Sequence, residues 1–186
     1  MMKRMWRASR APSRQQTRAE TFPMAVRPII RFPNPLLATA AEPVTQFDED
    51  LRQLADDLAD TMRAAPGIGI TAPHIGILQR VMVIEIDRQE GPRSFVNPEI
   101  VWQSSETVRH DEGSVSMPGI VEEVERPARV RVRFQSLGGE AREEEAEGLM
   151  AVCLQHEIDQ LDGFFWLRRL SRLKRERAVK RFEKFN

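Results

Sequence analysis

Hydrophobic residues first take a regular spacing in the segment 48–63. Apolar side chains recur there at intervals of three and four residues, at Leu51, Leu54, Leu58 and Met62. This spacing places them on one face of an α-helix. The pattern therefore predicts a helix over 48–63 that packs on a sheet through this face, with Thr45 as its N-cap.

Strand-like patterns follow in the middle of the chain, at 80–86, 94–96, 100–107 and 128–135. In the last segment Val130, Val132 and Phe134 alternate with arginines, as a strand with one buried face requires. Strands gathered in mid-chain, with helices at either end, predict the α+β class rather than a regular alternation of strand and helix.

A second helix is predicted over 146–161, where apolar residues surround most of the circumference. Such a helix is buried. The acidic residues before and at its start would then lie at the positive end of the helix dipole; they are Glu143, Glu144, Glu145 and Glu147. Polar side chains in its middle are costly unless they have partners; they are Gln155, His156, Glu157, Asp159 and Gln160.

Both ends of the chain are basic. Residues 1–24 have little to bury, so we expect either a disordered basic tail or an over-long start, with translation beginning at Met24. Residues 171–184 predict a basic amphipathic helix. A chain of 186 residues is enough for one ordinary core, so 25–186 is predicted to form a single domain.

Charge and cysteine content limit the functional classes. The 28 Lys and Arg residues balance the 28 Asp and Glu residues, which argues against a DNA-binding or membrane-surface protein. The sole cysteine, Cys153, excludes an internal disulfide and is typical of a reducing compartment, so we expect a cytoplasmic protein. Cys153 belongs to the apolar set of the second helix, which favours a buried thiol over a nucleophile.

Three short segments carry the candidate chemistry. The first, Gly67-Ile68-Gly69-Ile70-Thr71-Ala72-Pro73-His74-Ile75-Gly76, is typical of a tight loop that exposes its backbone. The second, Glu112-Gly113-Ser114-Val115-Ser116-Met117-Pro118-Gly119, is a turn-forming stretch between predicted strands. His156-Glu157-Ile158-Asp159-Gln160 lies on the buried helix, one residue away from the H-E-x-x-H pattern that binds zinc through two histidines.

Together, in this order and at these separations, the segments resemble the peptide deformylase family, which removes the formyl group from the N-terminal methionine of new bacterial proteins. That family has a G-x-G-x-A-A-x-Q loop, an E-G-C-x-S segment and H-E-x-D-H on its central helix. The resemblance covers about residues 27–186, including Asn97-Pro98-Glu99 after a strand. It implies an α+β fold of mixed strands around a buried central helix.

The chain departs from the family at the metal site. One cysteine and two histidines hold iron or zinc in the family, but here Ser114 and Gln160 occupy two of these positions, and His156 is the single retained ligand. A hydroxyl and a carboxamide are poor donors for such a metal. A bound metal makes hydroxide available at neutral pH. We therefore expect weak or no deformylase activity and no cofactor.

The resemblance also assigns roles to the other residues of the site. Glu157 matches the acid/base residue of the family. Gly69, His74 and the backbone N–H of Val115 match the positions that bind the substrate and stabilise its oxyanion. His74 replaces a glutamine there, which is a third change at the same site.

Three functions remain open at this point. The first is a metal-free protein that binds a formyl-methionyl peptide or nascent chain without cleaving it. The second is an active hydrolase with a relocated metal, held by His74 and His156 with help from Glu112, His110 or Glu157. The third is a non-enzymatic protein that docks on the ribosome or on an active deformylase through its basic C-terminal helix.

Overall fold

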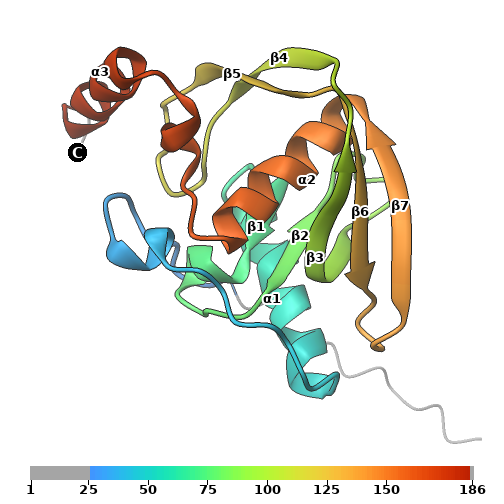
Figure 1. The fold of residues 1–186 in the computed structure, drawn as a ribbon. Helices are drawn as coiled ribbons and strands as arrows, with labels where there is room; N and C mark the ends of the chain where they lie inside the picture. Colours follow the sequence, from blue (N-terminus) through green and yellow to red (C-terminus); the bar gives the residue numbers. More distant parts are fainter. Residues whose placement is uncertain (1–25, 185–186) are drawn as a thin grey trace, which may run out of the picture.

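The computed structural model describes residues 26–184, so the expectations for residues 1–24 lie outside the described residues. Helix α2 (Gly148–Leu161) runs through the middle of the molecule. A five-stranded sheet lies on one side of α2 and the two-stranded β4–β5 sheet lies on the other (Figure 1). The expected α+β fold around a buried central helix is thereby confirmed.

The larger sheet is antiparallel throughout, in the order β1-β2-β3-β6-β7. Its strands are β1 (Gly69–Thr71), β2 (Val81–Ile84), β3 (Arg93–Gln103), β6 (Arg129–Gln135) and β7 (Ala141–Glu147). The smaller sheet pairs β4 (Thr107–Glu112) with β5 (Glu122–Pro127). The predicted strands at 80–86 and 128–135 correspond to β2 and β6.

The predicted strands at 94–96 and 100–107 are wrong as separate elements. They form one strand, β3, whose pairing with β6 shifts register between Val96 and Glu99. Asn97 has a φ of 51° at this irregularity and its side chain bonds to the backbone of Val44 at 2.8 Å. Asn-Pro therefore marks a bulge here rather than the end of a strand. Thr107 opens the next strand, β4.

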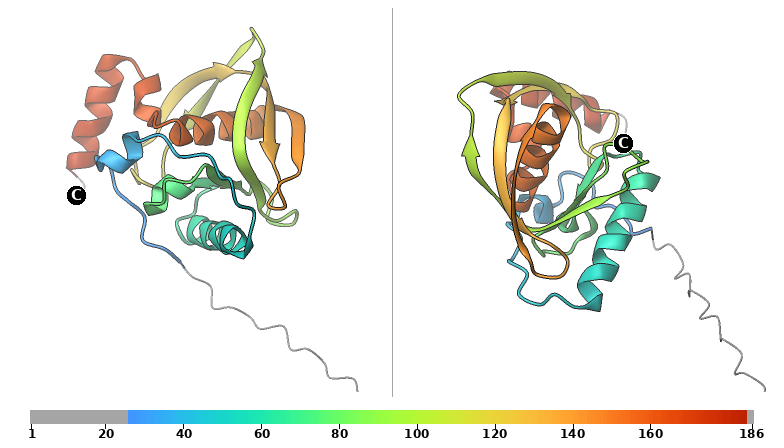
Figure 2. Two further views of the ribbon diagram at one scale, coloured as in Figure 1. Left: turned by 60° about the horizontal axis from the view of Figure 1, so that its bottom comes forward. Right: turned by 90° about the vertical axis from the view of Figure 1, so that its right-hand side faces the viewer.

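Helix α1 (Glu49–Ala64) covers the face of the sheet opposite α2 (Figure 2). Its predicted apolar stripe is buried, but its N-cap is Asp48, whose Oδ1 accepts from the N–H of Leu51 at 3.1 Å, and not Thr45. Strand β2 is buried on both faces: Val81 and Val83 pack with α1, while Met82 and Ile84 pack with α2.

The acidic cluster directly precedes α2, but it forms strand β7 and not the first turn of the helix; Glu147 is the N-cap residue, without a side-chain capping bond. Three of its glutamates stand in β7 opposite the arginines of β6: Glu143 opposite Arg133, Glu145 opposite Arg131, and Glu147 opposite Arg129. The ion pairs Arg131–Glu145 and Arg133–Glu143 are solvent-exposed and contribute little each, about 1 kcal/mol or less. The correction follows from Glu being a weak strand former, which hid β7 from the pattern. Helix α2 accordingly begins at Gly148 rather than Ala146.

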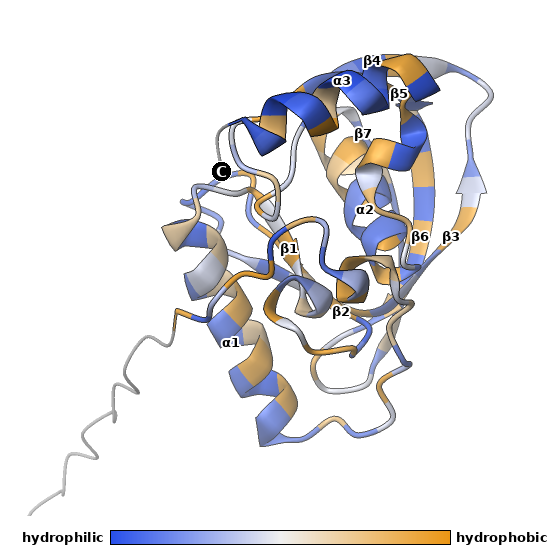
Figure 3. Ribbon diagram, turned by 90° about the vertical axis from the view of Figure 1, so that its left-hand side faces the viewer, coloured by the Kyte–Doolittle hydropathy of each residue, from blue (hydrophilic) through white to orange (hydrophobic). Residues whose placement is uncertain are grey.

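The C-terminal helix predicted over 171–184 is α3 (Arg172–Glu183), and Ser171 is its N-cap. It attaches through Ala178 and Phe182 to a third apolar cluster that includes Phe165 and Trp166. The rest of its surface is largely hydrophilic (Figure 3). Short 3₁₀ helices complete the chain at Pro35–Ala38, Ala72–Ile75 and Trp166–Arg169. None of the helices within residues 26–184 has the length and apolarity of a membrane span.

Candidate functional site

The three segments singled out in the sequence line one cavity of about 600 Å³. The loop before β1 forms one wall, the segment after β4 forms another, and α2 closes the third. Five of the predicted site residues line it, namely Gly69, His74, Val115, His156 and Glu157, together with Ser114. Its apolar wall includes Ile68, Leu149, Val152 and Cys153. Gln160 is not among the lining residues.

The position of Glu157 explains why residue 69 is glycine. The Glu157 carboxyl group lies against the backbone of β1, where a Cβ at position 69 would overlap its Oε1 and come within 3.0 Å of its Cδ. The Oε2 atom of Glu157 is buried and has no hydrogen-bond partner within residues 26–184. Burial raises the pKa of this carboxyl group to about 7.

His156 is oriented by Glu112, the last residue of β4. Its Nδ1 lies 2.8 Å from Oε2 of Glu112. Burial acts to raise the pKa of Glu112, but the hydrogen bonds of Arg126 and His156 outweigh it and lower that pKa to about 2. Glu112 is therefore ionised and Nδ1 of His156 is the donor. The other ring nitrogen, Nε2, is left to face the cavity.

Behind this pair stands a buried ionic network that sequence reasoning missed. Arg126 on β5 pairs with Glu112 and also donates to Asp159 of α2 at 2.8 Å. Asp159 accepts in turn from Arg169. Burial acts to lower the pKa of His156, whereas its bond to Glu112 raises it, and the pKa lies above the ordinary value. The acidic charges behind the site are thus matched by arginines.

His74 has the opposite hydrogen-bonding role from His156. Its Nδ1 accepts from the backbone N–H of Thr71 at 3.0 Å, so that nitrogen carries no proton. Burial, reinforced by the proximity of His156, lowers the pKa of His74 to about 3, which keeps the ring neutral. The proton is then on Nε2, which lies 3.5 Å from Oγ of Ser114. His74 donates to Ser114 and cannot act as its base.

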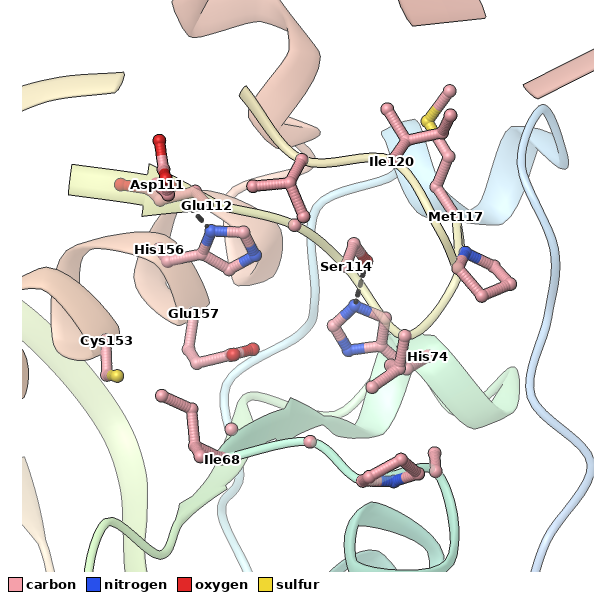
Figure 4. A pocket seen from close by; sticks show the side chains of 18 of the residues that line it. Ile68, His74, Asp111, Glu112, Ser114, Met117, Ile120, Cys153, His156 and Glu157 are labelled. Atoms are coloured by element: carbon pink, nitrogen blue, oxygen red, sulfur yellow. Dashed lines mark hydrogen bonds and ion pairs between the residues drawn. The ribbon is translucent and has the colours of Figure 1, made fainter. Parts of the chain in front are cut away.

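Side chains around the cavity converge on a common space. The carboxyl group of Glu157, the ring of His156, the hydroxyl of Ser114 and the ring of His74 all point toward it (Figure 4). Cys153 lies to one side, and burial raises the pKa of its thiol to about 12, which agrees with the predicted unreactive cysteine. His110 is exposed on β4, with Nδ1 2.9 Å from the carbonyl oxygen of Asp111.

A family model described as polypeptide deformylase matches residues 26–176. The chain belongs to the peptide deformylase family. A peptide deformylase-like protein of Rhizobium meliloti (strain 1021) is 82% identical over 163 residues, covering 88% of this chain and 95% of that protein. A peptide deformylase of Phenylobacterium zucineum (strain HLK1) is 49% identical over 164 residues, covering 87% and 97%.

Solved deformylase structures have the same fold. The crystal structure of a peptide deformylase from Legionella pneumophila matches with a TM-score of 0.82 at 41% identity, covering 87% of this chain and 95% of that one. The structure from Ehrlichia chaffeensis in complex with actinonin matches with a TM-score of 0.83 at 35% identity, covering 88% and 99%. The resemblance stated from the motifs is confirmed.

The donor atoms of this chain do not fit the metal of the family. Gln160 Nε2 donates to the carbonyl oxygen of Leu37 at 2.9 Å, so its side chain serves the fold. Ser114 offers a neutral hydroxyl, and only His156 Nε2 remains as a family-type donor. Within residues 26–184 there is no group of three or more His, Cys, Asp or Glu residues that could hold a metal ion.

The alternative ligand pair is not favoured by the hydrogen bonds either. His74 Nδ1 is occupied by the N–H of Thr71, and its Nε2 carries the proton in that tautomer. A metal ligand requires a ring nitrogen with a free lone pair. Binding through His74 would therefore first require the loss of its bond to Thr71.

Proposed function

We propose that this deformylase-family protein binds the methionyl N-terminal segment of a peptide or nascent chain in its cavity, without the metal-dependent hydrolysis of the family, as a cytoplasmic protein. Gln160 carries the proposal. A residue at the position of a metal ligand is buried, turned to Leu37 and absent from the cavity lining. The apolar wall of the cavity suits an unbranched apolar side chain such as that of methionine.

The oxyanion-stabilising positions support binding of a peptide end. The N–H of Val115 makes no hydrogen bond to the described residues, and the Nε2–H of the neutral His74 ring has only a long contact, 3.5 Å, with Oγ of Ser114. Both groups are donors of residues that line the same cavity as Glu157. Two donors and a carboxyl group in one cavity match the carbonyl and N–H of a peptide.

The test combines metal content with hydrolysis and binding. The full chain is purified without chelator or immobilised nickel, its metal is counted, and formyl-methionyl-alanyl-serine is supplied both as substrate and as ligand. We expect substoichiometric metal, no measurable turnover and saturable binding. Near-stoichiometric metal with turnover that Glu157→Ala abolishes would instead establish an active hydrolase with a relocated metal.

A second proposal concerns α3, on which several basic side chains are exposed. Arg181 pairs with Glu122, and Arg172 with Glu176, whereas Lys174, Arg177 and Lys180 make no ion pair within residues 26–184. Such a face suits an anionic partner such as the ribosome. Co-sedimentation with ribosomes should weaken with salt. It should be lost when Arg175, Arg177, Lys180 and Arg181 are neutralised together.

A further inference from the structure

The cavity has a second apolar wall, formed by the segment 113–121 between β4 and β5. No residue of this segment is charged, and Ser114 is its one polar side chain that lines the cavity. Figure 4 shows Met117 and Ile120 on one side of Ser114, and Ile68 on the other. Apolar side chains therefore lie on both sides of the polar centre of the site.

Val121 is the exposed part of this wall. Met117 and Ile120 are buried in the third apolar cluster, whereas Val121 is 54% exposed. Its Cγ2 atom lies over the backbone of Gly113, where a Cβ at position 113 would be 3.5 Å from it. The side chain thus stands beside the residue that precedes Ser114. A ligand group that covered Val121 would gain the free energy of burying apolar surface.

The apolar wall on the other side is exposed as well. Ile68 is 43% and Leu149 is 36% exposed, and both line the cavity where the methionine side chain is proposed to bind. The backbone N–H of Val115 belongs to the 113–121 wall and makes no hydrogen bond to the described residues. It is a donor for the carbonyl oxygen of a ligand amide, which would then lie beside the 113–121 wall.

The geometry of an acylated N-terminus matches a cavity with two apolar walls. An amide is planar and trans, so the group on its carbonyl carbon and the Cα on its nitrogen extend in opposite directions. If the methionine side chain packs on Ile68 and Leu149, the acyl group extends toward Val121. A formyl group has only a hydrogen atom at this position, and it would leave Val121 facing water.

We propose that the cavity binds N-terminal methionyl peptides whose acyl group is longer than formyl, with the acyl chain packed on Val121 and Pro118. The inference rests on the proposed function, because it assumes a methionyl ligand. Each buried CH₂ group strengthens binding about fourfold. A butanoyl group exceeds formyl by three carbon atoms, so the butanoyl peptide should bind at least about tenfold more tightly than the formyl peptide.

The experiment measures the binding of four peptides by titration calorimetry on the full chain at neutral pH. They are methionyl-alanyl-serine amides acylated with formyl, acetyl, butanoyl or methoxyacetyl. The methoxyacetyl group has an ether oxygen in place of one CH₂ group of butanoyl. Affinity should rise from formyl through acetyl to butanoyl, and the methoxyacetyl peptide should bind about fourfold or more weakly than the butanoyl peptide.

Two valine variants locate the acyl group. Val121→Asn should bring the ratio of butanoyl affinity to formyl affinity close to one, because it puts a polar amide in place of the apolar contact. Val108 is a 38% exposed valine on β4 that is not among the lining residues of the cavity, so Val108→Asn should leave the ratio intact. Circular dichroism checks that both variants fold. If Val121→Asn does not fold, the butanoyl and methoxyacetyl peptides on the wild type decide.

The outcomes separate this inference from the function on which it rests. A formyl peptide that binds as tightly as the butanoyl peptide overturns the inference and leaves the proposed function in place. A butanoyl preference that Val121→Asn does not reduce also overturns the inference, since the acyl group then lies elsewhere. Absence of binding by all four peptides overturns both the inference and the proposed function.

Discussion

The side-chain amide of Gln160 donates a 2.9 Å hydrogen bond to the carbonyl oxygen of Leu37, 123 residues away in the chain. Both residues are 2% exposed, so water does not compete for this bond. It ties the last turn of α2 to the 3₁₀ helix at Pro35–Ala38. The substitution at a metal-ligand position has therefore given the side chain a structural role.

Removing this tie should destabilise the protein. We expect Gln160→Ala to lower the free energy of unfolding by about 1–3 kcal/mol, because it leaves a buried carbonyl oxygen without its donor. Urea unfolding measures the change. Gln89→Ala, at an exposed loop position, is the matched control and should change stability by less than about 0.5 kcal/mol. Equal effects of the two substitutions would contradict the structural role.

Arg126 should be the most sensitive arginine in the described fold. It is 2% exposed and pairs with both Glu112 and Asp159. Arg126→Ala leaves the buried carboxylate of Glu112 without an arginine, whereas Asp159 keeps Arg169. Breaking such a buried network costs about 3–5 kcal/mol.

The control for Arg126 is another arginine on the sheet. Arg131 is exposed and pairs with Glu145, and Arg131→Ala should cost about 1 kcal/mol or less. Thermal or urea unfolding of the two variants should separate them clearly. Similar losses for both would show that the buried network does not stabilise the fold.

The sequence predicted the elements whose patterns are strong and the residues that carry motifs. Helix α1, strand β6 and α3 followed from spacing alone, and Gly69, His74, Val115, His156 and Glu157 do line one cavity. The short strand β1 and the glutamate-rich β7 have no alternating apolar face, so no pattern revealed them. Both strands are defined by their pairing with a neighbouring strand, β1 with β2 and β7 with β6. A pattern along the sequence does not contain this pairing.

The sequence also could not predict the hydrogen-bonding roles of the site residues. In the sequence, Arg126 belongs to none of the three motif segments, and nothing there links it to Glu112. The orientation of Gln160 toward Leu37 depends on contact between segments far apart in the chain. The tautomer of His74 depends on a backbone N–H that only the 3₁₀ turn brings to it. Tertiary packing decides each of these features.

Restoring the family ligands should restore metal binding. The double variant Ser114→Cys, Gln160→His supplies a thiolate and a second imidazole beside His156, and should retain about one divalent metal per chain. It should also hydrolyse formyl-methionyl-alanyl-serine, since a bound metal makes hydroxide available at neutral pH. Metal analysis and a formate-release assay check the two results separately.

Each single variant serves as a control for the double variant, because two family ligands bind far more weakly than three. Addition of His74→Gln should raise turnover further if the neutral imidazole is a poorer oxyanion donor than the glutamine of the family. If the double variant binds metal but shows no turnover, His74 would be the residue that prevents hydrolysis. A double variant without metal would show that the surrounding fold no longer accommodates one.

Glu157 should make the protein less stable as pH rises. Its native pKa of about 7 exceeds the ordinary value of 4.5, so between these values the native state keeps a proton that the unfolded chain has released. The free energy of unfolding then falls with rising pH, by an amount on the order of 3 kcal/mol from this group. The loss should begin near pH 4.5 and be complete above pH 7.

Glu157→Gln isolates this contribution, because the amide does not titrate while the other groups of the site remain. Urea unfolding at pH 5 and pH 8 should show that wild type loses more stability than the variant over this interval. Glu145→Gln should follow the wild-type profile, since its carboxylate is exposed in β7. Parallel profiles of wild type and Glu157→Gln would contradict the raised pKa of this carboxyl group.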